Sequence, residues 1–176
     1  MPNRPAVFFD RDGTLMEEVH YCNDPADVRA IAGAAAGLAR LRAAGWLTII
    51  ITNQSGLSSG KITQVQYEAV NAELGRQLDG LIDAVYFCPD APANPTHRRK
   101  PGTGMLDEAT IDHGIDLARS WMVGDKDIDI LCGFKAGCRT ILVETGYGKN
   151  HLSAGADFIV PDATAAIEIV LGQMTQ

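Results

Sequence analysis

Short apolar runs rich in β-branched residues alternate with segments of helical periodicity along this chain of 176 residues. Runs of this kind are typical of buried strands. The predicted strands are 6–9, 47–51, 84–87, 121–123, 140–143 and 158–160, and the predicted helices are 34–43, 63–78, 104–113, 128–136 and 163–171. The alternation predicts an α/β protein with a parallel sheet covered on both faces. The length fits a single domain over residues 1–176.

Composition excludes several classes of protein. Hydrophobic residues make up 46% of the chain and charged residues 21%, as in soluble globular domains. The apolar stretch 46–51 is too short to span a bilayer, and the N-terminus lacks a long apolar signal core, so a cytoplasmic location without membrane association is expected. The net charge of -7 argues against a nucleic-acid surface. A monomer with reduced cysteines is expected.

Two aspartates end the first apolar run, in the sequence Asp10-Arg11-Asp12-Gly13-Thr14. Residues two apart in an extended strand point to the same side, so Asp10 and Asp12 can converge. Two carboxylates this close repel each other, and a cation is therefore expected beside them. A simple turn at a polar strand end is the alternative.

Polar sequences also follow three other predicted strands or loops, at 52–56, 98–101 and 124–129. In open parallel sheets, ligands bind at the carboxyl ends of the strands, where the strand order reverses. The four polar clusters therefore predict one site at one edge of the sheet.

These clusters contain the groups that cleavage of a phosphate ester requires. An enzyme must place a nucleophile in line with phosphorus and neutralise the phosphoryl oxygens. Asp10 is the candidate nucleophile, which would form an aspartyl-phosphate. Asp12 is the candidate general acid and base. The hydroxyl of Thr52 and the ammonium group of Lys100 are candidates to hold phosphoryl oxygens.

Hard oxygen ligands for Mg²⁺ come from the same clusters. Asp10, Asp125 and the main-chain carbonyl of Asp12, together with waters, would complete an octahedral site. Asp129 is either a partner of the metal ligands or an acid favoured by the helix dipole. Simpler interpretations exist: Thr52 as a cap of the next turn and Lys100 as a solvated lysine. His113 and His151 have no partner at ligand spacing, and no role is assigned to them.

The four clusters, in this order, resemble the haloacid dehalogenase (HAD) superfamily of aspartate-nucleophile phosphotransferases. In detail they resemble its heptose-bisphosphate phosphatases and related histidinol-phosphatases. The similar segments are 10–14, 52–56, 86–89, 99–102, 104–106 and 122–126, and the resemblance covers residues 5–148. It implies a three-layer α/β/α Rossmann-like fold. The spacing between the motifs leaves no room for a cap domain.

The resemblance implies that Asp10 is the nucleophile, Asp12 the acid and base and Asp125 a magnesium ligand. Thr52 and Lys100 would stabilise the phosphoryl group. The residues expected to bind the substrate are Glu18, His20, Tyr21, Asn53, Gln54, Ser55, Arg99 and Lys126.

The implied substrate is a small phosphorylated sugar, D-glycero-D-manno-heptose 1,7-bisphosphate, which would lose its 7-phosphate. Histidinol phosphate, or a general preference for small phosphomonoesters, is the first alternative. A phospho-accepting receiver-like signalling module is the alternative from another class. In such receivers the phosphorylated aspartate follows a later strand, whereas here the paired acids follow the first.

One loop departs from the family pattern. Relatives commonly carry a structural zinc before the Arg-Lys-Pro motif, bound by a Cys-x-His pair and a later Cys-x-Cys pair. Cys88 is retained here, but Asp90 stands at the histidine position, and Thr96 and Arg98 correspond to the later cysteines. Tetrahedral zinc needs about four ligands. Because Cys88, Asp90 and His97 would be an improvised set, zinc is predicted to be absent.

Overall fold

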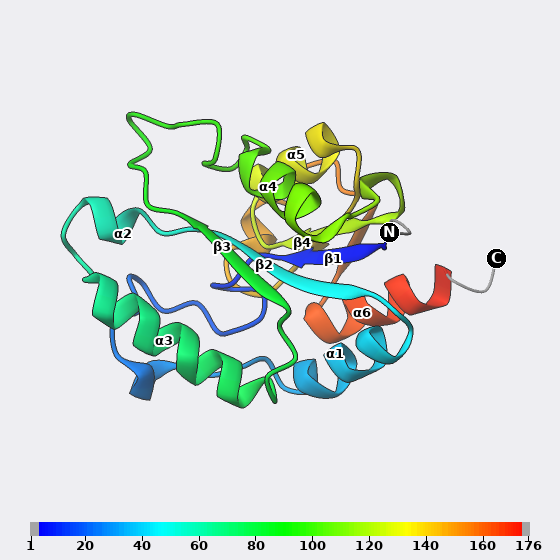
Figure 1. Ribbon diagram of the computed structural model, residues 1–176, viewed down its shortest axis with the longest axis horizontal. Coiled ribbons are helices and arrows are strands. Elements are labelled where there is room, and N and C mark those ends of the chain that lie inside the picture. The colour runs from blue at the N-terminus through cyan, green and yellow to red at the C-terminus, as the bar shows by residue number, and fades with distance from the viewer. Residues whose placement is uncertain (1–3, 174–176) are drawn as a thin grey trace.

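Six parallel strands form one sheet in the computed structural model, which describes residues 4–173, in the order β3-β2-β1-β4-β5-β6 (Figure 1). The strands are β1 (Ala6–Phe9), β2 (Leu47–Asn53), β3 (Ala84–Cys88), β4 (Trp121–Gly124), β5 (Arg139–Val143) and β6 (Phe158–Val160). All six predicted strands are confirmed. The structure extends β2 to Asn53, so Thr52 is a strand residue rather than a loop residue.

The predicted helices are also present. They are α1 (Ala34–Ala43), α3 (Gln64–Gln77), α4 (Gly104–His113), α5 (Asp127–Ala136) and α6 (Ala163–Gly172). Thr63 caps α3 in a capping box with Gln66. The short helix α2 (Ser55–Ser58) lies where the sequence suggested only a polar loop. Three 3₁₀ turns complete the structure: η1 (Pro25–Asp27), η2 (Leu117–Arg119) and η3 (Gly148–Asn150). No helix within residues 4–173 is long and apolar enough to cross a membrane.

The helices cover both faces of the sheet. Figure 1 shows α1, α3 and α6 below the strands and α4 and α5 above them. Along β1, Val7 and Phe9 pack into one apolar cluster with Leu38 of α1, whereas Phe8 packs into the other with Met105 of α4. Both faces of β1 are buried because successive side chains point to opposite sides. The expected three-layer α/β/α fold is confirmed.

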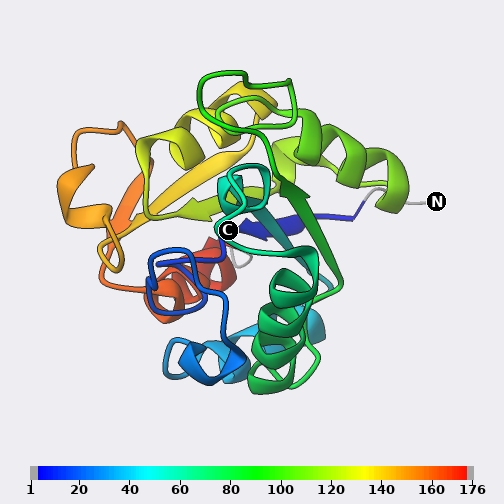
Figure 2. The same ribbon diagram turned by 90° about the vertical axis from the view of Figure 1, so that its left-hand side faces the viewer.

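The topology determines where a ligand can reach the sheet. From β1 the chain continues to β2 on one side, while β4 pairs with the other side of β1, so the strand order reverses between β1 and β4. This end of the sheet faces the viewer in Figure 2. Residues 10–33, after β1, contain only η1 and isolated bridges, and residues 89–103, after β3, contain no helix or strand. Neither segment forms a cap domain.

Candidate active site

Asp10 and Asp125 lie together because they follow adjacent strands. The backbone N–H of Asp10 donates to the carbonyl of Val123 at 2.9 Å, which continues the pairing of β1 with β4. Asp10 is 6% exposed and Asp125 is fully buried. With Asp129 of α5 they bring carboxylate oxygens within 4.8 Å of one another, and no other group of three acidic, histidine or cysteine residues in the described part of the chain does so.

Lys100 is buried between two of these carboxylates. Its Nζ lies 2.7 Å from Oδ1 of Asp10 and 2.7 Å from Oδ1 of Asp129, and it also donates to the carbonyl of Ile51 at 2.7 Å. The interpretation of Lys100 as a solvated lysine is therefore wrong, since the residue is 3% exposed. Asp129 holds the lysine, and its Oδ2 accepts the backbone N–H of Lys126 at 3.0 Å.

Burial perturbs the titration of these groups. Desolvation raises the pKa of Asp10 to about 6. The positive charge of Lys100 offsets only part of this rise, and the negative charges of Asp129 and Asp12 add to it. Desolvation, together with the charges of Asp10 and Asp129, raises the pKa of Asp125 to about 8. Strongly raised pKa values on two neighbouring buried carboxyls mark this cluster as a candidate functional site.

The donor set fits a hard divalent cation. Oδ2 of Asp125 accepts the backbone N–H of Tyr147 at 2.8 Å, whereas its buried Oδ1 has no hydrogen-bond partner among residues 4–173. A Cβ atom on Gly13 would lie 2.4 Å from Oδ2 of Asp125, and one on Gly146 would lie 2.3 Å from the same oxygen. Two glycines thus enclose this carboxylate. Asp10 and Asp125 are the residues that could hold Mg²⁺ here.

Asp12 belongs to a separate hydrogen-bonded group on the pocket side. Arg11 donates to both of its carboxylate oxygens, from Nε at 3.1 Å and from Nη2 at 3.0 Å. Gln54 donates through Nε2 to Oδ2 of Asp12 at 2.8 Å and to Oγ1 of Thr52 at 2.8 Å. The amide of Gln54 therefore connects Asp12 and Thr52, two of the four predicted catalytic residues.

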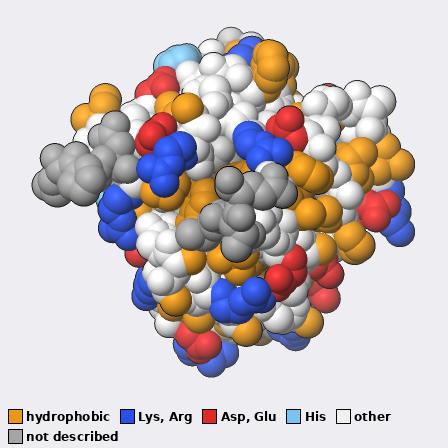
Figure 3. Space-filling model, turned by 90° about the vertical axis from the view of Figure 1, so that its right-hand side faces the viewer, with side chains coloured by type: hydrophobic (Ala, Val, Ile, Leu, Met, Phe, Trp, Pro, Cys, Tyr) orange, Lys and Arg blue, Asp and Glu red, His pale blue; other side chains and the backbone are white. Residues whose placement is uncertain are grey.

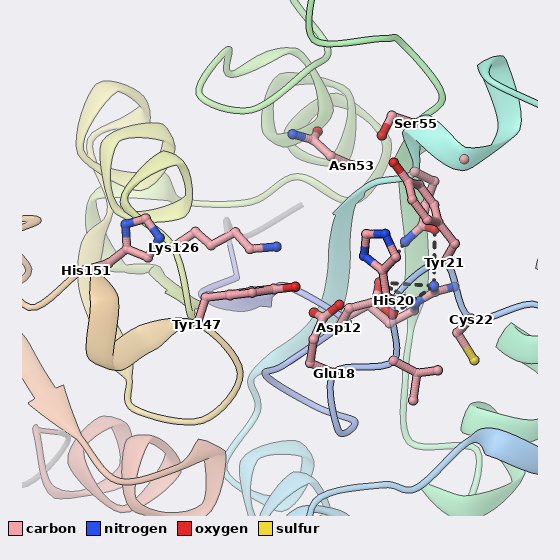
Figure 4. A pocket seen from close by; sticks show the side chains of 14 residues that line it. Asp12, Glu18, His20, Tyr21, Cys22, Asn53, Ser55, Lys126, Tyr147 and His151 are labelled. Atoms are coloured by element: carbon pink, nitrogen blue, oxygen red, sulfur yellow. Dashed lines mark hydrogen bonds and ion pairs between the residues drawn. The ribbon is translucent and has the colours of Figure 1, made fainter. Parts of the chain in front are cut away.

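A pocket of about 350 Å³ opens above these groups, a size suited to a small metabolite (Figure 4). Lys126 and Tyr147 reach into it from one side, toward Asp12, Glu18 and His20. The residues that line it are Arg11, Asp12, Glu18, Val19, His20, Tyr21, Cys22, Asn53, Gln54, Ser55, Gly56, Lys126, Tyr147 and His151. Seven of the eight predicted substrate-binding residues are among them, and Arg99 is not.

Comparison with known proteins identifies the family. The HAD-hydrolase-like family model matches residues 97–166. The chain is 41% identical to a D-glycero-D-manno-heptose-1,7-bisphosphate 7-phosphatase of Thermosynechococcus vestitus, with 94% of each protein covered. It is 33% identical to the D-glycero-beta-D-manno-heptose-1,7-bisphosphate 7-phosphatase of Escherichia coli K12, over 97% of this chain and 90% of that protein. The chain belongs to the HAD phosphatases.

Solved structures agree with this assignment. The D,D-heptose 1,7-bisphosphate phosphatase of Bordetella bronchiseptica, complexed with magnesium and phosphate, matches with a TM-score of 0.88 and 30% identity, over 96% of this chain and 99% of that one. A putative HAD-like phosphatase of Mesorhizobium loti matches with a TM-score of 0.80 and 30% identity, over 97% and 88% of the two chains. The relatives are phosphatases, so the receiver-like alternative is not supported.

The pocket of this HAD phosphatase includes side chains that sequence reasoning missed. Tyr147 and His151 come from the segment after β5, where no motif was recognised. The ammonium group of Lys126 lies 4.6 Å from the centre of the Tyr147 ring. Nδ1 of His151 lies 3.4 Å from Oδ1 of Asp127. The one local signal was Gly146 and Gly148 around Tyr147, a pattern typical of a turn that approaches another backbone closely.

The loop before Lys100 is held by hydrogen bonds and ion pairs. Arg99 donates through Nη1 to the carbonyl of Asp90 at 2.6 Å, so its guanidinium contacts its own loop. Oδ2 of Asp90 accepts the backbone N–H of Thr96 at 2.8 Å. Nε2 of His97 lies 3.0 Å from Oδ2 of Asp107. In the described chain, Cys88, Asp90 and His97 do not gather into a metal-binding group.

A second cavity, of about 470 Å³, lies at the opposite edge of the sheet, where the strands begin. Figure 3 shows the face of the molecule on this side. The lining of the cavity includes Trp46, Arg119, Trp121 and Arg139. Positive, negative and hydrophobic side chains are interspersed on this face. The cavity is larger than the first, but none of the residues that line it is acidic. The smaller pocket is therefore the candidate active site of the phosphatase.

Proposed function

We propose that this phosphatase removes the 7-phosphate of D-glycero-D-manno-heptose 1,7-bisphosphate in an Mg²⁺-dependent reaction, through a phosphoryl group carried by Asp10. The observation that carries the mechanism is the ion pair of 2.7 Å between Asp10 and Lys100, next to the unpartnered Oδ1 of Asp125 and below the pocket. The names of the relatives at 41% and 33% identity support the choice of substrate.

In the first step, Asp10 attacks phosphorus. Its Oδ1 is held by Lys100, which leaves Oδ2 as the nucleophilic oxygen. The bond from Oδ2 to phosphorus forms, and the bond from phosphorus to the sugar oxygen breaks. Lys100 stays protonated, because Asp10 and Asp129 raise its pKa against the opposing effect of burial, and its charge limits repulsion between nucleophile and phosphate.

Asp12 transfers protons in both steps. It protonates the leaving sugar oxygen in the first step, then takes a proton from the water that attacks the aspartyl-phosphate. Inorganic phosphate leaves and Asp10 is restored. Among the described residues, Oδ1 of Asp12 accepts a bond from Arg11 alone, whereas Oδ2 accepts bonds from Arg11 and Gln54. Oδ1 therefore has more capacity left, and we assign the proton to it.

Asp10, Asp125 and the main-chain carbonyl of Asp12 would hold Mg²⁺. When bound, the ion neutralises phosphoryl charge and orients the phosphate for in-line attack. The hydroxyl of Thr52 would donate a hydrogen bond to a phosphoryl oxygen, while its Oγ1 accepts one from Gln54. Glu18, His20, Tyr21, Asn53, Ser55 and Lys126 would contact the sugar and its second phosphate.

Phosphate release from a panel of substrates tests the proposal. The panel contains heptose 1,7-bisphosphate and histidinol phosphate, each with and without Mg²⁺. We expect the highest kcat/KM on the heptose, loss of turnover in Asp10→Asn, and little change in Asp27→Asn, an exposed control. Turnover by Asp10→Asn would refute the assignment of Asp10 as the nucleophile. A preference for histidinol phosphate, or equally low rates on every substrate, would refute the proposed substrate.

A further inference from the structure

Arg11 stands between the two aspartates of the first motif, yet its side chain turns away from solvent. It is 1% exposed, whereas the side chain of its partner Asp12 is 18% exposed. The guanidinium presents Nε and Nη2 to the two oxygens of Asp12, which is the bidentate geometry that best determines the orientation of a carboxylate. Asp12 thus faces the pocket while Arg11 holds its carboxylate from the buried side.

The other side of the guanidinium is anchored to α3. Nη1 of Arg11 donates to Oδ1 of Asn71 at 2.8 Å, and the guanidinium carbon lies 5.6 Å from the centre of the Tyr67 ring. Nη2 also donates to Oε1 of Gln54 at 3.2 Å. α3 contributes no residue to the lining of the pocket. α3 contacts the site through Arg11.

From this geometry we infer that Arg11, held by Asn71 and Tyr67 of α3, is a positioning residue that orients Asp12 for proton transfer. The inference rests on the proposed role of Asp12. A proton donor must lie within hydrogen-bond reach of the leaving oxygen, so a small misplacement lowers the rate strongly. Arg11 itself, with only 1% of its side chain exposed at the pocket wall, offers a substrate almost no contact surface.

The test compares two kinds of phosphate ester. An alkyl phosphate, such as the sugar phosphate, needs a proton on its leaving oxygen. An aryl phosphate, such as p-nitrophenyl phosphate, has a leaving group that departs as an anion. Because kcat/KM reports the step in which the leaving group departs, a residue that acts through Asp12 should affect the alkyl ester more than the aryl ester. A purely structural residue would lower both values equally.

Arg11→Lys keeps the positive charge but removes the guanidinium that donates to both oxygens of Asp12. We expect its kcat/KM to fall about a hundredfold on the alkyl ester but only about tenfold on the aryl ester. Asn71→Ala should follow the same pattern, with a loss of roughly tenfold on the alkyl ester. Glu68→Ala, on the exposed side of the same helix, is the matched control and should leave both values unchanged. Asn71→Ala keeps the test available if Arg11→Lys does not fold.

A double-mutant cycle tests whether Arg11 acts through Asp12. In an Asp12→Asn background, Arg11→Lys should lower the remaining rate no further. Additive losses, or equal losses on both esters, would overturn the role of Arg11. If Asp12→Asn by itself left activity on the alkyl ester intact, the proposed function of Asp12 would fail instead.

Discussion

Lys100 and Asp129 form an ion pair of 2.7 Å in which each side chain is 1% exposed. The aspartate therefore anchors the lysine whose other charged partner, Asp10, is the proposed nucleophile. A charge buried at this depth needs a partner, since its water shell has been removed.

Asp129→Ala should consequently destabilise the protein. Lys100 would keep Asp10 but lose its second charged partner, and we expect the free energy of unfolding to fall by about 2 kcal/mol. Urea unfolding monitored by circular dichroism measures the change. Asp127→Ala, on the same turn of α5 but with a side chain that is 62% exposed, should change it by less than about 1 kcal/mol. Equal effects of the two substitutions would contradict the anchoring role.

The raised carboxyl pKa values predict how stability depends on pH. Unfolded aspartates have a pKa of about 3.9, whereas the pKa is about 8 for Asp125 and about 6 for Asp10 in the metal-free fold. The native state thus binds more protons than the unfolded state between about pH 4 and 8. The free energy of unfolding of metal-free protein therefore falls as the pH rises through this window.

Mg²⁺ should reverse this trend, because it needs the ionised carboxylates. We expect saturating Mg²⁺ to raise Tm by several degrees at pH 8 and by less at pH 5.5. Differential scanning fluorimetry checks both values. Asp125→Asn should remove most of the difference. An equal shift at the two pH values would count against a site formed by Asp10 and Asp125.

Gly146 should not tolerate a side chain. A Cβ there would lie 2.3 Å from Oδ2 of Asp125 and 2.7 Å from Cα of Gly13, at a φ of +56°. Gly146→Ala should displace the Asp125 carboxylate. Because groups that orient a metal ligand affect both binding and activity, we expect kcat/KM and the affinity for Mg²⁺ each to fall by about tenfold or more. Titration of Mg²⁺ against phosphate release measures both.

Gly60 offers a matched control for that substitution. Its φ is +71°, but in the described part of the chain no atom beyond its own neighbours in sequence lies within 4 Å of the position of an added Cβ. Gly60→Ala should therefore lose about 1 kcal/mol of stability through backbone strain alone and keep its affinity for Mg²⁺. Similar losses of metal affinity in the two variants would show that strain, not displacement of Asp125, is responsible.

The N-terminus of α3 provides a local test. Thr63 accepts the backbone N–H of Gln66 at 3.3 Å, and Gln66 accepts the backbone N–H of Thr63 at 2.9 Å. Thr63→Ala should reduce the free energy of unfolding by about 1 kcal/mol, while Thr63→Ser should be nearly neutral. Chemical denaturation of both variants decides this. A stability loss in Thr63→Ser as large as in Thr63→Ala would mean that the cap hydroxyl is not what matters.

Several expectations stay predictions. They are the absence of zinc, a monomeric state, a cytoplasmic location, and a single domain over the whole chain, including the termini outside residues 4–173. The roles of Arg99 and of the other predicted substrate-binding residues are predictions as well.

Local signals in the sequence were sufficient for the fold and for the chemical groups at the site. The strands and the five longer helices follow from the spacing of apolar residues, and Asp10, Asp12 and Asp125 from their places after strands β1 and β4. Such signals depend on neighbours in the chain, and a sequence displays neighbours directly.

Only the tertiary structure decided which side chains meet. Arg11 pairs with Asp12 but is anchored sixty positions further along, at Asn71. Tyr147 and His151 enter the pocket, while Arg99 turns back to Asp90. These contacts join segments that are distant in sequence or depend on how a loop folds, and the packing of the layers brings them together. The two aspartates that follow β1 are separated by the same packing: Asp10 is buried with Lys100, and Asp12 faces the pocket.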